Sequence, residues 1–181
     1  MHNKLKNILG AMAAVLFLAG CSSTQSLQEY YVDNTENPNF LVIDVPANIL
    51  KLDEESLDDT QQAALKSLRK LNILFFKKTE ENKEEYKAET AKVKEILKNS
   101  DFKELMKLNS PYAKGVIKYA GDGDAIDEVV IFGDSEENGF GLVRVLGDDM
   151  NPAHFMQLMQ AIQKADVDGE GFEELMGMFK G

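Results

Sequence analysis

The chain has 181 residues, of which 44% are hydrophobic and 28% are charged, a composition that suits one globular domain with a core of ordinary size. Its formal net charge is −11, and residues 21–181 alone hold 18 basic against 31 acidic side chains. Nucleic acids and anionic bilayers both attract clustered Lys and Arg, so this balance argues against a nucleic-acid partner and against adsorption to a membrane through a basic face.

The first segment has the three parts of a secretory signal. Lys4 and Lys6 form a short basic start, residues 8–18 are apolar, and small residues precede Cys21. The apolar run is shorter than the roughly 20 residues with which a helix spans a bilayer. We therefore predict a signal peptide over residues 1–20, against the alternatives of an ordinary secreted protein or an uncleaved signal anchor.

The order Leu18-Ala19-Gly20-Cys21 resembles the lipobox of bacterial lipoproteins. The resemblance implies cleavage before Cys21, a diacylglycerol on its thiol and an acyl chain such as palmitate on the new amino terminus. Two or three chains make such an anchor effectively permanent. Because Cys21 is the chain's one cysteine, we expect no disulfide and no thiol nucleophile in the mature domain.

The residues after Cys21 are small and polar, and we predict that residues 21–38 form a lipidated flexible tether. No acidic residue follows Cys21 directly, a pattern that in lipoprotein families is compatible with the outer membrane. We expect a cell-envelope protein, anchored in the outer membrane and facing the periplasm.

Residues 39–181 are predicted to form a single domain. A β-branched run over 40–45, stopped by Pro46, predicts a strand. Helical spacing of apolar residues predicts a helix from Ser56 to Leu71, and 72–77 has the composition of a buried strand. A long charged helix is expected over 79–99, with a short helix restarting at Ser100.

Three strands are predicted next, over 112–119, 128–132 and 140–146, separated by turns rich in Gly, Asp and Asn. Asn151-Pro152 has the signature of a helix start, and a last helix is expected over 170–179. This βαβαβββαα order predicts an α+β fold, with a single mixed or antiparallel sheet of about five strands and helices packed on one face.

The run Phe-Leu-Val-Ile-Asp-Val-Pro over 40–46, the run Gly-Leu-Val-Arg-Val-Leu-Gly-Asp over 141–148 and the Asn151-Pro152 helix start together resemble the DUF4252 family of Bacteroidetes-type lipoproteins. That family is of undetermined function. The resemblance therefore implies an envelope location and supplies no activity.

Residues 166–171 resemble the start of a calcium-binding EF-hand loop. Asp166, Asp168 and Glu170 stand at the first, third and fifth loop positions, and a glycine follows at the sixth. Gly177 occupies the twelfth position, where the loop needs a bidentate Glu. The favoured interpretation is an acidic turn between helices, with calcium as the alternative.

A second acidic group follows from the predicted meander. Two strand reversals bring the Asp122-Gly-Asp124 turn to the same end of the sheet as Asp148 and Asp149. Four carboxylates either spread into solvent or share a cation, and spreading is the favoured interpretation.

Catalytic side chains are few. His154 is the one imidazole after the signal segment, which argues against zinc or acid–base chemistry built on several histidines. We predict no cofactor and no enzyme activity, and instead a protein-binding or regulatory module. Its C-terminal helices are rich in Met and Phe, and although core packing is their favoured role, they are the expected surface for an envelope partner.

Overall fold

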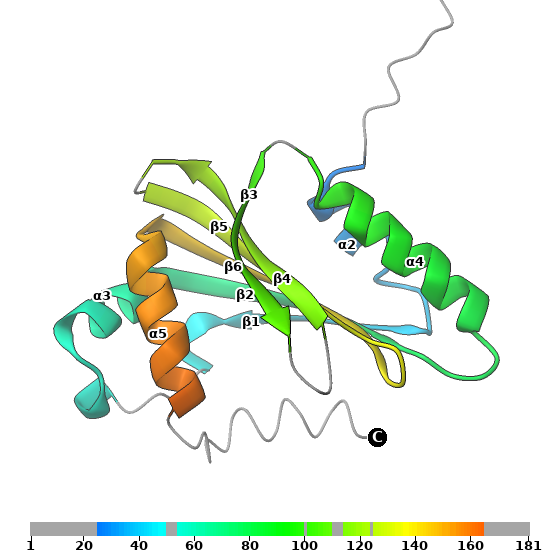
Figure 1. The fold of residues 1–181 in the computed structure, drawn as a ribbon, viewed down its shortest axis with the longest axis horizontal. Helices are drawn as coiled ribbons and strands as arrows, with labels where there is room; N and C mark the ends of the chain where they lie inside the picture. The colour runs from blue at the N-terminus through cyan, green and yellow to red at the C-terminus, as the bar shows by residue number, and fades with distance from the viewer. Residues whose placement is uncertain (1–24, 50–53, 100, 110–113, 124, 165–181) are drawn as a thin grey trace, which may run out of the picture.

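The computed structural model describes residues 25–49, 54–99, 101–109, 114–123 and 125–164 (Figure 1). The helices are α2 (Leu27–Asp33), α3 (Asp59–Ser67), α4 (Lys83–Ile96) and α5 (Pro152–Lys164), with two short 3-10 turns, η1 (Ala47–Ile49) and η2 (Glu54–Ser56). The strands are β1 (Phe40–Pro46), β2 (Leu68–Lys77), β3 (Phe102–Asn109), β4 (Lys114–Asp122), β5 (Ala125–Ser135) and β6 (Gly139–Met150).

All the strands belong to one antiparallel sheet with the order β1-β2-β6-β5-β4-β3. The α+β class and the single sheet are confirmed. The sheet has six strands, where about five were predicted. The predicted meander of three strands is part of a longer one that runs from β3 to β6, and β6 then pairs with β2 in the middle of the sheet.

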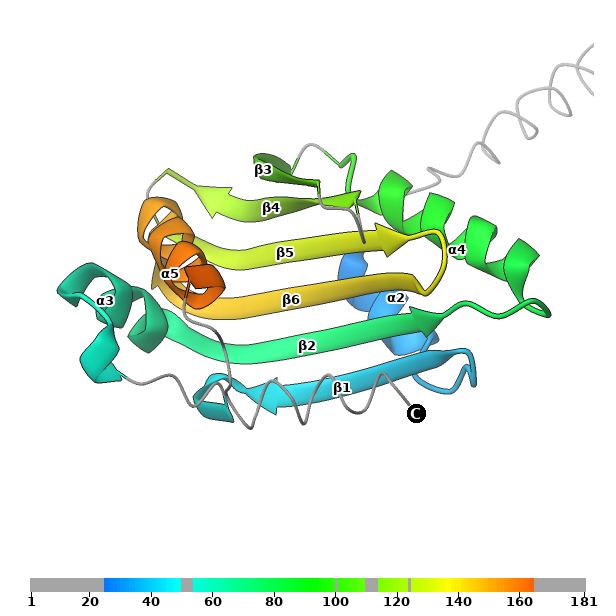
Figure 2. The ribbon, with the colours of Figure 1, turned by 60° about the horizontal axis from the view of Figure 1, so that its bottom comes forward.

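The helices lie on both faces of the sheet, so the prediction of one helical face is wrong. We call the face under α2 and α4 the first face, and the face under α3 and α5 the second face. Figures 1 and 2 show that the two pairs of helices lie toward opposite ends of the strands. Each face is thus covered by described helices over only part of its length.

Two segments differ from the prediction. Residues 27–33, expected within a flexible tether, form α2, in which Ser26 and Glu29 make a reciprocal capping box and Tyr30 is fully buried. Residues 102–109, whose start was expected to be helical, form the edge strand β3 paired with β4. A bulge between Glu104 and Met106 shifts the register of this strand. The apolar residues therefore follow neither the two-residue period of a strand nor the 3.6-residue period of a helix; they are Phe102, Leu105, Met106 and Leu108.

Candidate functional site

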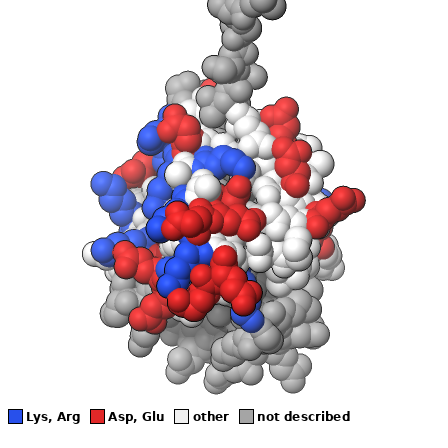
Figure 3. Space-filling model, turned by 90° about the vertical axis from the view of Figure 1, so that its right-hand side faces the viewer, with Lys and Arg blue, Asp and Glu red and all other residues white. Residues whose placement is uncertain are grey.

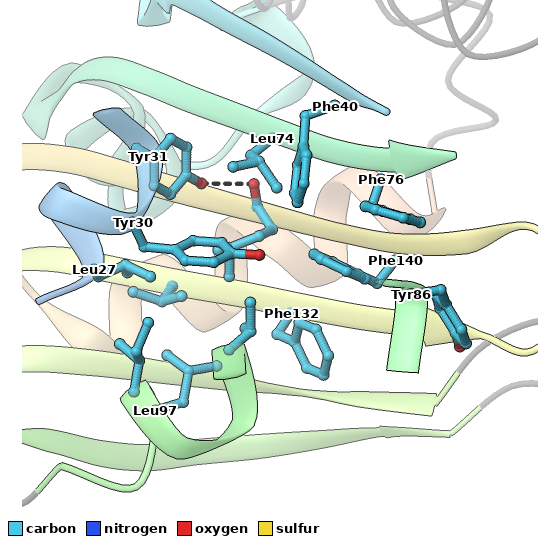
Figure 4. Close-up of a cluster of buried hydrophobic side chains, with 14 residues drawn as sticks. Leu27, Tyr30, Tyr31, Phe40, Leu74, Phe76, Tyr86, Leu97, Phe132 and Phe140 are labelled. Atoms are coloured by element: carbon cyan, nitrogen blue, oxygen red, sulfur yellow. Dashed lines mark hydrogen bonds between the residues drawn. The ribbon is translucent and has the colours of Figure 1, made fainter. Parts of the chain in front are cut away.

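An aromatic cluster fixes α2 and α4 to the first face (Figure 4). Phe76 and Phe140, paired across β2 and β6, stack with ring centroids 5.5 Å apart, and Phe40 meets Phe76 edge-on at 4.9 Å. Tyr30 brings α2 onto this cluster and Tyr86 brings α4. Phe40, Phe76 and Phe140 are at most 8% exposed, so this half of the first face is a hydrophobic core.

The outer side of α4 carries alternating charges, seen at the end of the molecule in Figure 3. Its acidic and basic side chains pair at a spacing of three residues, as in Glu84–Lys87 at 2.7 Å and Glu95–Lys98 at 2.8 Å. Exposed pairs of this kind are screened by solvent and contribute little to stability. The mixed signs keep the helix hydrated and form no patch of a single charge on which a charged ligand would collect.

Beyond α2, the first face carries a half-buried ion pair. The guanidinium of Arg144 donates to both carboxylate oxygens of Glu128, at 2.8 and 3.0 Å, and the two side chains are only 11% and 16% exposed. Burial works against the charged form of Arg144, but Glu128 outweighs it and raises the pKa of the guanidinium. The guanidinium carbon also lies 5.7 Å from the ring centre of Tyr31, on α2.

Arg144 lies in a row of paired residues on the first face that continues through Asn72 on β2 to Asp44 on the edge strand β1. Asn72 and Asp44 are paired in register, and Asp44 accepts hydrogen bonds from Asn72 and, at 2.6 Å, from Lys70. These groups satisfy one another within the row. We interpret the network as a structural lock that holds α2 and the edge strand to the sheet, and not as a ligand site.

The second face holds a different arrangement in the half away from α3 and α5. Gly115 pairs with Gly133, Gly133 with Gly141, Gly141 with Phe75, and Phe75 with Leu41. These positions form one row across β4, β5, β6, β2 and β1, which we call the glycine row. All of its members are half-buried, and no described helix crosses it in Figure 2.

The glycine row leaves space above the middle of the sheet. A Cβ atom placed on Gly133 would meet nothing within 4 Å, and one on Gly141 would touch only the ring of Phe75, at 3.9 Å. The next row toward α5 is apolar throughout, with Ile43, Val143 and Ile131 half-buried and Ile73 and Ile117 fully buried. The result is a shallow apolar strip, and glycine inside a strand often marks such a close approach by another chain segment.

Only some of the residues of the two predicted acidic sites lie in the described part of the chain. Asp122 ends β4 and Asp149 lies near the end of β6, at the same end of the sheet, as the meander predicts. Asp148 forms an ion pair with Arg69 at 3.0 Å. Asp124, Asp166, Asp168, Glu170 and the lipidation site Cys21 lie outside the described residues. Within the described parts, no three His, Cys, Asp or Glu side chains are grouped so as to hold a metal ion.

Core packing, the favoured role of the C-terminal Met and Phe residues, holds for part of the set. Phe155 is 2% exposed and Met150, just before the helix, is 1% exposed, whereas Met156 and Met159 are half-buried. The helix expected over 170–179, with its Met and Phe residues, lies outside the described residues. Asn151 accepts hydrogen bonds from the backbone of Ala153 and His154, which confirms the predicted helix start. His154 is half-buried on the first turn of α5.

The glycine row was missed at the level of the sequence, although a signal for it exists. Ser135 pairs with Gly139 across the β5–β6 hairpin, and the same register places Gly133 opposite Gly141. Gly133 and Gly141 are equally far from the turn in sequence, so a hairpin places them opposite each other. This pattern predicts a position without side chains on one face of the hairpin. The third glycine, Gly115, required the β4–β5 register as well.

None of the described helices has the length and apolar character needed to cross a membrane. No curated protein and no solved structure matches the chain. The model of the family described as a domain of unknown function (DUF4252) matches residues 30–158, which include the second half of α2, every described strand and the first half of α5. The chain therefore belongs to the DUF4252 family.

Proposed function

We propose that the chain is a cell-envelope lipoprotein, anchored by acyl chains on Cys21, that acts as a non-catalytic protein-binding module. Its binding surface is the glycine row with the apolar row beside it. The partner is an envelope protein that offers the apolar stripe of an amphipathic helix. The observation that carries this proposal is the glycine row with the apolar row beside it, which is open at Gly133 and Gly141 and lies under no described helix.

The dimensions of the row suit a helix. From Phe75 on β2 to Gly115 on β4 the row crosses three strand spacings, about 14 Å at ~4.8 Å each. An α-helix with its side chains is about 10–12 Å wide and rises 1.5 Å per residue, so two to three turns cover the row. Binding in this mode depends on anchors at i, i+3, i+4 and i+7.

The anchor gives the module its location. Ser26 caps α2, so residues 21–26 are the whole connection between the acylated cysteine and the folded domain. Fully extended, that connection reaches about 18 Å. The domain is then held close to the bilayer, where envelope partners lie.

Two measurements test the proposal. For the anchor, Cys21→Ser should abolish labelling by radioactive palmitate and move the protein from the membrane to the soluble fraction. Unchanged labelling and fractionation would refute lipid anchoring.

For the surface, a photoreactive phenylalanine analogue at Leu41 should crosslink a defined partner in intact cells. Gly133→Leu, which fills the open position, should remove that crosslink, whereas Val32→Ser on the exposed side of α2 should leave it unchanged. Circular dichroism confirms that both variants are folded. A crosslink that survives Gly133→Leu would rule out the glycine row as the binding surface.

A further inference from the structure

The sheet is open, and its two edge strands differ in character. At one edge, β3 carries the exposed charges of Lys103, Glu104 and Lys107 and a bulge after Glu104, features that keep a strand edge from pairing with another chain. At the other edge, β1 pairs with β2 in unbroken register and has the sequence Phe-Leu-Val-Ile-Asp-Val-Pro. No described element pairs with its outer side (Figure 2). A regular and largely apolar edge of this kind is a template for a further strand.

The hydrogen bonds at the start of β1 show which of its backbone groups point outward. The N–H of Lys77 donates to the carbonyl oxygen of Asn39 at 3.2 Å, and these residues extend the β1–β2 register by one pair. In an antiparallel ladder, hydrogen-bonded pairs alternate with pairs whose backbone groups point away from each other. The odd-numbered residues of β1 therefore bond to β2, and the even-numbered residues turn their N–H and C=O groups outward.

The outward donors of β1 are confined to its middle. At one end, the N–H of Phe40 donates to the carbonyl oxygen of Asn37 at 3.0 Å, and at the other end Pro46 has no N–H. Between them, the N–H groups of Val42 and Asp44 have no acceptor among the described residues. The edge thus offers two free donors, flanked on each side by a position that offers none.

We infer that β1 pairs antiparallel with β1 of a second copy of the chain, about a two-fold axis at Ile43. Val42 of each copy then lies opposite Asp44 of the other, so that each free N–H meets a free carbonyl oxygen. Phe40 lies opposite Pro46, so the positions without a free donor fall together. The result is one continuous sheet that spans both copies. This inference concerns the edge of the sheet and does not depend on the proposed function.

The side chains suit the same register. Ile43 meets its own counterpart on the second face, at a position without hydrogen bonds, where Cβ atoms come within about 4.5–5.5 Å. Asp44 lies opposite Val42 and not opposite the other Asp44, so like charges are not paired, and its carboxylate is already balanced by Lys70 at 2.6 Å. The apolar row beside the glycine row ends at Ile43, so it continues without a break into the second copy.

A single introduced cysteine traps this pairing. In the full chain with Cys21→Ser, an introduced cysteine is the only thiol. Ile43→Cys brings two copies of that residue together with Cα atoms about 4.5 Å apart, within the range of a disulfide, so mild oxidation should convert most of the protein to a covalent dimer on a non-reducing gel. Val42→Cys is the matched control, because it lies opposite Asp44, and it should stay monomeric. Equal yields from the two variants, or no dimer from either, would overturn the inference.

A second variant tests the backbone pairing itself. Val42→Pro removes an outward donor and no hydrogen bond between β1 and β2. Combined with Ile43→Cys, it should lower the yield of covalent dimer to that of the Val42→Cys control, while urea titration shows that the fold is retained. A yield that Val42→Pro leaves unchanged would rule out pairing through β1.

Crosslinking in intact cells distinguishes a second copy from a strand of another protein. A photoreactive phenylalanine analogue at Ile43, in a chain that also carries Gly133→Leu, should give a product of twice the chain's mass. Gly133→Leu is included because it fills the glycine row and so removes the helix proposed to bind there. A product that contains another protein would assign the edge to that protein and overturn the inference. The proposed function is tested separately, by the crosslink at Leu41 and its loss with Gly133→Leu.

Discussion

Tyr31 is the residue that joins α2 to the centre of the sheet. Its hydroxyl lies 2.6 Å from the carbonyl oxygen of Leu142 on β6 (Figure 4) and 3.0 Å from that of Asn72 on β2. Burial raises the pKa of the phenol well above its ordinary value, so the hydroxyl stays protonated and remains a donor. The two partners lie 41 and 111 residues away along the chain, so no local pattern predicts this contact, and the sequence around Tyr31 predicts only a tether.

Replacing the hydroxyl tests this contact. Tyr31→Phe keeps the ring and removes the single O–H proton that the two buried carbonyl oxygens share, so we expect the free energy of unfolding to fall by about 1–2 kcal/mol. Urea titration followed by circular dichroism measures the change. Val32→Ala, on the neighbouring residue that is 67% exposed, should stay within about 0.5 kcal/mol of the parent. Equal effects from the two variants would show that Tyr31 contributes no buried hydrogen bond.

Asp44 makes stability depend on pH in the acidic range. Burial alone would raise the pKa of its carboxyl, but the hydrogen bonds from Lys70 and Asn72 outweigh burial and lower it. In the unfolded chain the pKa of an Asp carboxyl is about 3.9. The stability that the charged Asp44 contributes is fully present above that pH, and it is lost as the pH falls through the lower pKa of the folded protein. Because the Asp44 side chain is 54% exposed, we expect Asp44→Asn to cost no more than about 1 kcal/mol at neutral pH.

Denaturant titrations at pH 7 and pH 3 measure this effect. The difference between the parent and Asp44→Asn should shrink at pH 3, because the parent has then lost part of the same contribution. A difference that stays constant between the two pH values would contradict the assigned role of the carboxylate.

At the scale of elements, long segments with one clear period were predictable. The buried strand β2, the charged helix α4, the strands β4 to β6 and the start of α5 all follow the sequence pattern, with ends shifted by a few residues. Short elements were not. α2 has seven residues, and its burial depends on Tyr30 meeting Phe40 and a glutamate of α4, contacts that no local pattern contains.

Two glycines at the β5–β6 hairpin should respond in opposite ways to alanine. Gly139 has a φ of 116°, and a Cβ there would meet the carbonyl oxygen of Phe76 at 1.9 Å, so Gly139→Ala should destabilise by at least about 2 kcal/mol. Gly133 is open, and Gly133→Ala should be neutral or stabilise by up to about 1 kcal/mol. Thermal unfolding separates them, since 1 kcal/mol corresponds to about 2–4 °C for a chain of this size. Comparable losses in the two variants would mean that Gly133 is already in contact with another group.

At the scale of the whole molecule, the offset between the helices of the two faces decides where a binding surface can lie. The half of the first face beyond α2 carries an ion-pair network, whereas the half of the second face away from α5 carries the glycine row. The sequence predicted the sheet but not this offset. Which face of the sheet a helix covers depends on how the segments that connect it to the strands pass the edge of the sheet. The order of helices and strands along the chain does not determine this.

The buried tyrosines make the fold sensitive to alkali. Burial raises the pKa of Tyr30, Tyr31 and Tyr86, helped by the neighbouring carboxylates Glu89 at Tyr30 and Asp134 at Tyr86. In the unfolded chain a phenol titrates near pH 10, so their contribution is complete below that value and falls by about 1.4 kcal/mol per pH unit above it for each phenol that stays protonated. We expect a steep step in phenolate absorbance that coincides with the loss of the circular dichroism signal. Gradual titration of every tyrosine with an unchanged dichroism signal would contradict this expectation.

The short connection to Cys21 predicts an orientation at the membrane. Under the proposed acylation of Cys21, a connection of at most about 18 Å to the cap of α2 would keep the α2 end of the domain near the bilayer, while α5 lies at the opposite end of the strands (Figure 1). A dye on Gln28→Cys should therefore transfer energy to an acceptor at the vesicle surface more efficiently than a dye on Gln157→Cys; both positions are exposed. A flexible Gly-Ser insertion after Ser22 should reduce the difference, because the domain then rotates freely on a longer tether. Equal transfer from the two positions without the insertion would show that the connection does not orient the domain, and access of partners to the glycine row would then owe nothing to the anchor.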